Sequence, residues 1–397
     1  MRTYRELFTL PEFSVLFGAV SLRVAAGTVS GLALGTLVYA RTGSPLLSAL
    51  SMFGSSFAQV IGALTVLSVA DRVPPRRALT AIGITFGLAT LVLAIPGMPV
   101  WGLLAVIAAL GLVGAASGGI QWGLVAEVVP DGAYILGRSV FSMTVGLMQI
   151  VGFAAGGLLV TAFSARGTLL VGAGLYLTSA LLIRFGLSAR PARATGRPSV
   201  GQTLRVNAEL WRSRPRRYTY LALWVPNGLI VGCEALFVPY APGHAGLLLM
   251  ASAAGMLAGD LTAGRLLSPP WRARLITPAR CLLAAPYLVF ALGPELPVAV
   301  IVVAVASVGY SAGLMLQDRL VTLTPPELRG QALGLHSSGL LTMQAVGATL
   351  AGTLASTLAI DTTMAVLAVA SLLITAVLTP GLRERSTMEV TLARAGG

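Results

Sequence analysis

Two charged side chains lie inside long apolar runs of this sequence. Arg23 lies within the first run, and Glu234 lies midway along LALWVPNGLIVGCEALFVPYA. A buried, unpaired ion is costly, so each side chain needs a counter-ion, a ligand or a proton. Low-dielectric surroundings favour the neutral form of a carboxyl group, which makes Glu234 the candidate for a side chain that exchanges protons. Glu234 is equally interpreted as the ion-pair partner of Arg23, which could alternatively hold an anionic group of a ligand.

Neutral polar side chains in other apolar runs could line a ligand pocket. Gln149 and Gln344 occupy equivalent positions of two similar segments, and each needs hydrogen-bond partners if it lies in hydrocarbon. They either hold helices together or face a shared cavity. Further candidates for stacking and hydrogen bonding in a mostly apolar pocket are Gln121, Asn227, Trp224, Tyr39 and Tyr240.

The sequence lacks the patterns of several other chemistries. No Glu/His cluster has metal-ligand spacing, and neither a phosphate-binding Gly loop nor a Ser/His/Asp constellation occurs. The two cysteines lie in apolar runs without a second ligand nearby, so neither a disulfide nor a zinc site is indicated. We therefore expect no cofactor, no metal and no enzymatic activity. The residues interpreted as solvated or structural are Glu127, Asp318, His244 and His336.

The composition predicts which elements hold these residues. Of 397 residues, 56% are hydrophobic and only 10% are charged, whereas soluble domains carry about 25% charged residues. The apolar runs are roughly 20 residues long, enough to cross a hydrocarbon core of about 30 Å as helices. An all-α integral membrane protein is predicted. Its twelve transmembrane helices are expected near residues 13–40, 46–70, 78–96, 99–125, 134–163, 167–187, 218–240, 245–267, 275–293, 297–320, 331–357 and 362–380.

An internal repeat divides the twelve spans into two halves. MQIVGFAAGG at 148–157 returns as MQAVGATLAG at 343–352 with five of ten positions identical, and a Pro precedes each copy at the same distance. A second pair of similar segments, GALTVLSVADRVPPRR and GMLAGDLTAGRLLSPPWR, supports a duplication. Because each half has an even number of spans, the halves are expected to be parallel six-helix bundles around a central cavity.

The arginine positions predict the orientation in the membrane. All 27 basic residues are Arg, and 24 of them fall in segments on the side of the N-terminus, while the loops on the other side hold only Arg41 and Arg166. Since positive charge marks the cytoplasmic side, both termini are expected to be cytoplasmic. The net charge of +13 is therefore assigned to topology rather than to nucleic-acid binding.

The predicted domains are an N-terminal bundle (1–187), a basic linker (188–217), a C-terminal bundle (218–380) and a cytoplasmic tail (381–397). Within the linker, the spacing of Val200, Leu204, Ala208 and Trp211 suits a short amphipathic helix on the inner membrane surface. The linker is interpreted mainly as a tether, with a regulatory role as the alternative.

The loop DRVPPRR at residues 71–77 is the most specific local motif. It resembles the loop between helices two and three of the major facilitator superfamily, an Asp-Arg pair followed by a Gly and two basic residues. Pro74 stands at the Gly position, and Leu67 replaces a Gly one turn earlier. Twelve spans, two parallel halves and a basic central loop extend the resemblance over the whole chain. It implies that Asp71 pairs with a neighbouring helix end and latches one conformation.

The resemblance also assigns roles to the basic residues of this loop and to its counterpart in the second half. Arg72, Arg76 and Arg77 belong to the latch, the last two mainly as topological signals. Arg265 is retained in the second half, and Asp260 lies one turn before the position equivalent to Asp71. We expect Asp260 to serve the latch, with a position facing the cavity as the alternative.

The repeated segment resembles a second signature of this family, the antiporter pattern Gly-Pro-x-x-Gly-Gly, with Phe153 in place of the Pro. Small residues at such spacing let two helix backbones approach closely. The glycines are interpreted first as packing residues and only second as a mark of antiport. They are Gly152, Gly156 and Gly157 in span five, with Gly347 and Gly352 in span eleven.

The resemblance implies a secondary transporter similar to bacterial drug and metabolite exporters. In that family spans one and seven, which here carry Arg23 and Glu234, line the central cavity. We expect export of a small, partly apolar organic compound by proton antiport, with an uncoupled facilitator or importer, or a non-transporting sensor, as alternatives. The Arg- and Ala/Gly/Leu-rich composition suits a GC-rich bacterium, hence its plasma membrane. A lipid-embedded monomer is expected, with no nucleic-acid partner.

Overall fold

The computed structural model describes residues 4–65, 73–130, 134–191 and 200–395, and regular structure in these ranges is helical. The first half contains α1 (Tyr4–Leu7), α2 (Pro11–Thr42), α3 (Pro45–Phe53), α4 (Ser55–Thr65), α6 (Pro75–Leu93), α7 (Val100–Val128) and α8 (Tyr134–Gly186). The helix α9 (Val200–Arg212) leads to the second half. That half contains α10 (Arg214–Ala235), α11 (Phe237–Tyr240), α12 (Ala245–Leu261), η1 (Thr262–Leu266), α13 (Pro269–Ala284), η2 (Ala285–Leu292), α14 (Leu296–Val308), α15 (Ser311–Thr322), η3 (Pro326–Leu328), α16 (Arg329–Leu354) and α17 (Ile360–Ala395).

The helices match the membrane spans predicted from hydropathy. Ten helical stretches within the described residues are long and apolar enough to cross a membrane. One of them, Leu136–Gly186, contains two helices that meet at Ser164, whose φ of 70° is not helical. The 26-residue helix α16 lies at the eleventh predicted span but is not among these ten stretches. Each of the twelve predicted spans therefore contains a helix, and the all-α membrane fold is confirmed.

The helix boundaries depart from the prediction in the last span. α17 continues to Ala395, so residues 381–395, predicted as a tail, are helical. The segment after Pro380 is rich in Leu, Arg, Glu, Met and Ala, which are good helix formers. Hydropathy reports where a helix leaves the hydrocarbon but not where it ends.

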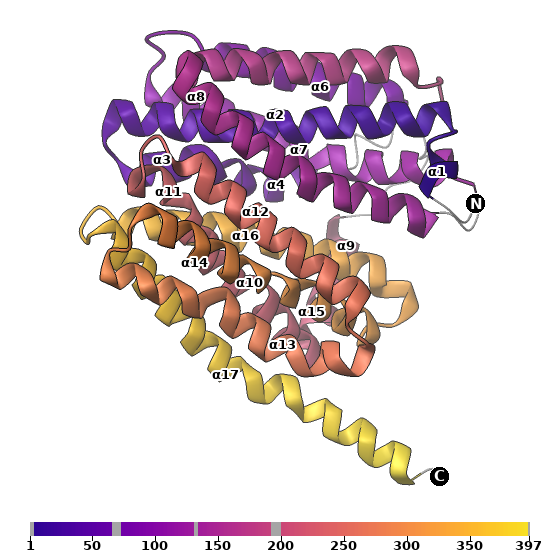
Figure 1. The fold of residues 1–397 in the computed structure, drawn as a ribbon. Helices are drawn as coiled ribbons and strands as arrows, with labels where there is room; N and C mark the ends of the chain where they lie inside the picture. Colours follow the sequence, from indigo (N-terminus) through magenta and orange to yellow (C-terminus); the bar gives the residue numbers. More distant parts are fainter. Residues whose placement is uncertain (1–3, 66–72, 131–133, 192–199, 396–397) are drawn as a thin grey trace.

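The two halves pack against each other through the helices that carry the repeated segments. Figure 1 shows the first half, in indigo to magenta, beside the second half, in orange to yellow. α8 packs on α12, and α16 packs on α3 and α4. A Cβ atom on Gly246 would lie 2.8 Å from Cα of Gly157, and one on Gly352 would lie 2.5 Å from Cα of Leu46. Gly246 and Leu46 lie where α12 and α3 begin, at the end of the molecule opposite the chain termini, here called the distal end.

The other glycines of the repeat bring helices together within each half. A Cβ on Gly152 would overlap the hydroxyl of Thr28 on α2, and Gly156 lies beside the α2 backbone. In the second half, a Cβ on Gly347 would overlap the carbonyl oxygen of Gly228 on α10. Small residues permit these approaches because dispersion contacts between backbones replace side-chain volume.

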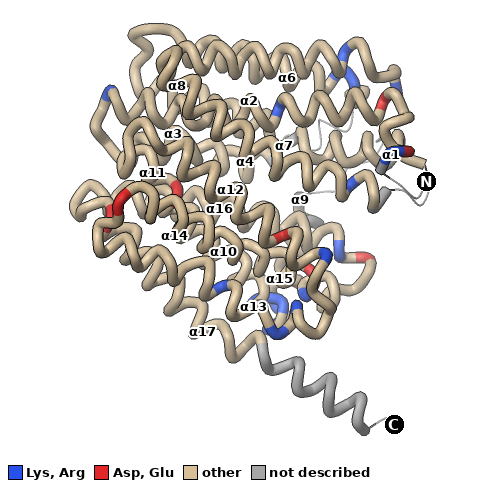
Figure 2. The backbone as a smooth tube through the Cα atoms, viewed as in Figure 1, with Lys and Arg blue, Asp and Glu red and all other residues tan. Residues whose placement is uncertain are grey.

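Charge is concentrated at one end of the bundle. Figure 2 shows most of the Arg residues, in blue, near the end that carries both termini. Arg280 departs from this distribution, because it lies on α13 inside the bundle. Its side chain is only 1% exposed, and its three nitrogens have no hydrogen-bond partner within the described residues.

The linker helix α9 packs on the second half rather than only on a membrane surface. It contacts α10 and α16. Leu210 is fully buried, and the ring of Trp211 stacks on Trp224 and Tyr220 with centroid distances of 5.6 and 6.1 Å. Leu204, predicted on the apolar face, is 54% exposed. The aromatic stack turns the contact face of the helix toward α10.

Replacing Trp211 by Ala is expected to release α9 from the second half. The loss of the stacked pairs and of buried area should cost about 2 kcal/mol of docking free energy. Limited proteolysis of the detergent-purified protein should then cleave near α9 faster and its melting temperature should fall. Leu204→Ala, on the exposed side of the same helix, should change neither; equal effects of the two variants would contradict the docking role.

Candidate functional site

A cavity of about 400 Å³ lies between the two halves. Pockets of this size are typical of small-molecule sites. Its walls come from α3 and α8 of the first half and from α10, α12, α15 and α16 of the second. The lining residues are Met52, Phe53, Gln149, Phe153, Leu223, Asn227, Val231, Glu234, Leu249, Ser252, Ala253, Met256, Asp260, Tyr310, Gly313, Leu314, Gln317, His336, Leu340 and Gln344.

Glu234 lies in the cavity wall on α10 and is 9% exposed. Its Oε1 accepts hydrogen bonds from the hydroxyls of Ser252 at 2.6 Å and Tyr310 at 3.0 Å. The Ser307 hydroxyl donates in turn to Ser252 at 3.0 Å. The carboxyl group is thus held by neutral hydroxyls from α12, α14 and the α14–α15 connection, and it has no ion-pair partner in the described part of the chain.

The two repeated glutamines both reach this cavity. Gln149 lines it from α8 and Gln344 from α16. The Gln344 amide also donates a hydrogen bond to the Asn227 side-chain oxygen at 3.4 Å. The two sequence interpretations therefore coexist for Gln344, since it joins α16 to α10 and also faces the cavity.

Arg23 lies elsewhere, so the expected Arg23–Glu234 pair is not formed. Its guanidinium donates a hydrogen bond to the Gln121 side-chain oxygen, and both residues line a small separate cavity inside the first half. α2 and α7 bring them together and turn them away from the boundary between the halves. The expectation that Arg23 and Gln121 line the central cavity is wrong for this structure.

Three aromatic residues expected at the cavity also lie outside its lining. Trp224 stacks on Trp211 and donates its indole N–H to the His336 carbonyl oxygen at 3.0 Å. The Tyr240 hydroxyl donates to the Pro294 carbonyl oxygen at 2.9 Å. Tyr39 and Tyr240 both pack against an apolar cluster, mainly of the second half, that includes Phe237 and Phe290. The rings of Trp224 and Tyr240 fill contacts between helices, where their polar atoms find backbone partners.

Asp260 and His336 reverse their sequence interpretations. Asp260 was expected at the latch, but it is exposed to the central cavity on the last turn of α12. It has no hydrogen bond or ion pair within the described residues. His336, expected to be structural, lines the same cavity, and its Nδ1 is buried without a hydrogen-bond partner. Hydropathy placed both residues near span ends but could not tell whether their side chains face the cavity.

The predicted latch is described only in part. Asp71 and Arg72 lie outside the described residues. Arg76 donates a hydrogen bond to the Leu187 carbonyl oxygen at 3.0 Å and thereby ties α6 to the end of α8, while Arg77 is exposed. Arg265 reaches the Met143 sulfur of the other half at 3.5 Å.

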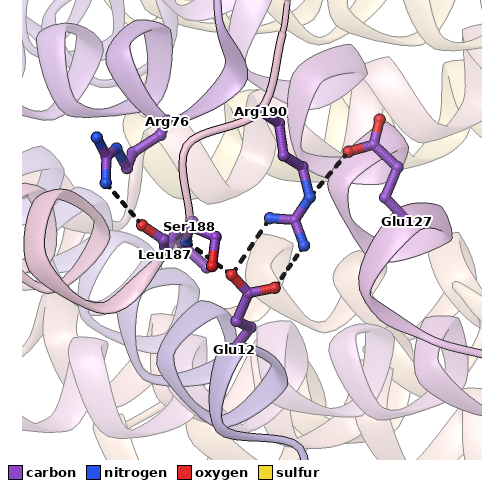
Figure 3. A network of polar contacts seen from close by, with 6 residues as sticks. All are labelled: Glu12, Arg76, Glu127, Leu187, Ser188 and Arg190. Atoms are coloured by element: carbon purple, nitrogen blue, oxygen red, sulfur yellow. Dashed lines mark hydrogen bonds and ion pairs between the residues drawn. The ribbon is translucent and has the colours of Figure 1, made fainter.

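A polar network that the sequence interpretation missed joins the first half to the start of the linker. Figure 3 shows the Arg190 guanidinium between Glu12 and Glu127. Arg190 pairs with the Glu12 carboxylate, and its Nε lies 3.4 Å from Glu127 Oε2. Glu12 also accepts the backbone N–H of Ser188 at 2.7 Å. Glu127, expected to be solvated, is thus a network member. An acidic residue in a first helical turn was the available signal, but its partner lies 178 residues away.

Comparison with known proteins agrees with this architecture. The Major Facilitator Superfamily model matches residues 15–317. A POT family transporter in complex with a thioalcohol-conjugated peptide superposes with a TM-score of 0.76 at 13% identity, covering 94% of this chain and 96% of that one. A bacterial homologue of the human lysosomal transporter Spinster, inward-facing and unoccupied, gives 0.72 at 13% identity, with 94% and 96% covered. A peptide transporter POT in complex with sulfate gives 0.71 at 14% identity, with 93% and 94% covered.

No curated protein matches the chain in sequence. At the identities of the structural relatives, the similarity shows the fold alone. The family match extends over more than half of the chain and includes the cavity-lining helices α3, α8, α10 and α12. The protein therefore belongs to the Major Facilitator Superfamily.

Proposed function

We propose that this transporter exports a small, partly apolar organic compound by proton antiport. The observation that carries the proposal is the setting of Glu234. It lies in the wall of a cavity of substrate size and is held by two hydroxyl groups rather than by a cation. A carboxyl group so placed can take up a proton without losing an ion pair, because hydroxyls can reorient to accept as well as donate.

The closure of the distal end supports alternating access. On α8 the lining residue Gln149 precedes the contact residue Gly157, and on α12 the contact residue Gly246 precedes the lining residue Ser252. Likewise, on α16 the lining residue Gln344 precedes the contact residue Gly352, and on α3 the contact residue Leu46 precedes the lining residue Met52. Because neighbouring spans run in opposite directions, the tight contacts lie on the distal side of the cavity in all four helices. Rocking of the halves about the cavity would open this side.

The proposed setting is a bacterial plasma membrane with both termini in the cytoplasm. The concentration of Arg at the end that carries the termini supports this orientation. The distal end then faces outward, and the cavity belongs to an inward-facing state. The proposed domains remain the bundles 1–187 and 218–380 with the linker 188–217 between them, in a monomer surrounded by lipid.

Flux measurements in proteoliposomes test the proposal. Compounds that raise the melting temperature of the purified protein, drawn from organic cations, anions and neutral antibiotics, would be added outside the liposomes and a pH gradient imposed. We expect uptake against the compound's gradient when the lumen is acidic, and efflux when the outside is acidic. Flux that ignores the pH gradient would support an uncoupled facilitator, and cotransport with protons would indicate an importer. No flux of any stabilising compound would overturn transport itself.

A further inference from the structure

The charged side chains that the structure describes in the cavity wall have one sign. Among the described lining residues they are Glu234 and Asp260, and none of these residues is Arg. The basic residue expected there, Arg23, is bonded to Gln121 inside the first half. Low-dielectric walls strengthen the field of charges that line a cleft and so raise the local concentration of ions of opposite sign. The cavity is therefore suited to a positively charged ligand.

The two carboxylates differ in what holds them. Glu234 is almost completely buried, and Oε1 accepts two hydroxyl hydrogen bonds. Asp260 is exposed to the cavity and has no partner within the described residues. The nearest basic residue along the chain, Arg265, does not line the cavity, and its guanidinium contacts Met143. Asp260 therefore has its charge available to a ligand.

The remaining wall suits an apolar body next to that charge. Phe53 and Phe153 present aromatic rings from the first half, and Met256 lies on the same helix as Asp260. Aromatic faces attract cations as well as apolar groups. The unpartnered Nδ1 of His336 is a second polar point in the wall that a ligand can satisfy.

We propose that the cavity binds an organic cation, an ammonium or phosphonium group on an apolar body, and that Asp260 is the residue that recognises the positive charge. The inference rests on the proposed function and names its substrate class. Glu234 remains the proton site, so the two carboxylates have separate tasks. This division follows from their surroundings, because among the described lining residues only Asp260 offers an unoccupied carboxylate to the cavity.

Binding of tetraphenylphosphonium to the purified protein tests the recognition step. We expect the wild type to bind it and Asp260→Asn to raise its Kd about tenfold or more, the effect of removing one charge pair from a low-dielectric site. Asp260→Glu should restore most of the affinity and shows that the site still folds. Asp318→Asn removes an exposed carboxylate near the cavity but outside its lining and should leave the Kd within about twofold.

The outcomes separate this inference from the proposed function. Equal Kd values for wild type and Asp260→Asn, or tighter binding of the isosteric anion tetraphenylborate that Asp260→Asn does not weaken, would overturn cation recognition. The proposed proton antiport would then stand if other compounds still showed a pH-driven flux. Conversely, Asp260-dependent binding of tetraphenylphosphonium without flux of this cation in proteoliposomes would support the site while counting against transport.

Discussion

Replacing Glu234 by Gln is expected to reduce proton-driven flux to the level of protein-free liposomes while substrate still binds. The amide keeps the size of the side chain and can accept the hydrogen bonds of Ser252 and Tyr310 through its oxygen, but it cannot exchange a proton. The cavity shape should therefore be kept and only the coupling lost. Flux of a stabilising compound under an imposed pH gradient, and its Kd without a gradient, measure the two effects separately. The Kd should change less than about threefold because neutral contacts are retained.

Matched variants make this result specific. Glu295→Gln alters an exposed carboxyl group at the distal start of α14 and should leave flux unchanged. Ser252→Ala removes one of the two donors to Glu234 and should lower the flux several-fold without abolishing its pH dependence, since one hydrogen bond contributes about 1 kcal/mol. A Glu234→Gln protein whose flux still follows the pH gradient would show that the carboxyl group is structural.

Replacing Gly246 by Val is expected to hold the distal end open and so stop the transport cycle. Its Cβ would lie 2.8 Å from Cα of Gly157 and 2.8 Å from the carbonyl oxygen of Phe153, both backbone atoms of the other half. Overpacking of this kind costs about 1–3 kcal/mol, which shifts a two-state equilibrium by roughly 5- to 150-fold. The contact lies between the halves, so the packing inside each half should survive.

Distances between spin labels at the distal ends of the two halves measure this shift. Labels on Thr42→Cys and His244→Cys, with Cys233 and Cys281 replaced by Ala, should show a longer mean distance in Gly246→Val. Transport should fall on the order of tenfold or more. Gly174→Val is the control, because a Cβ there meets nothing within 4 Å. Unchanged label distances together with normal flux would mean that this contact does not control closure.

The parts of the network in Figure 3 show why sequence positions alone mislead about partners. Glu12 lies in the first turn of α2 and Arg190 follows α8, so their pairing requires the start of the first span and the end of the sixth to be neighbours. Arg23 raises the same problem within one half. A buried arginine demands a partner, but any of several polar residues satisfies that demand equally well, and only the packing of α2 on α7 selects Gln121.

The sequence by itself determined the class, the number of spans and the duplication. Crossing hydrocarbon requires about 20 apolar residues in a helix, which is a local property that can be read along the chain. The repeat located Gln149 and Gln344 at equivalent positions, and both line the cavity. Only the tertiary structure decided which face each helix turns inward. Lipid and protein interior are both apolar, so such helices lack the polar side that reveals direction in soluble proteins. For that reason Asp260 was expected at the latch but lies in the cavity, and Arg23 was expected in the cavity but lies inside the first half.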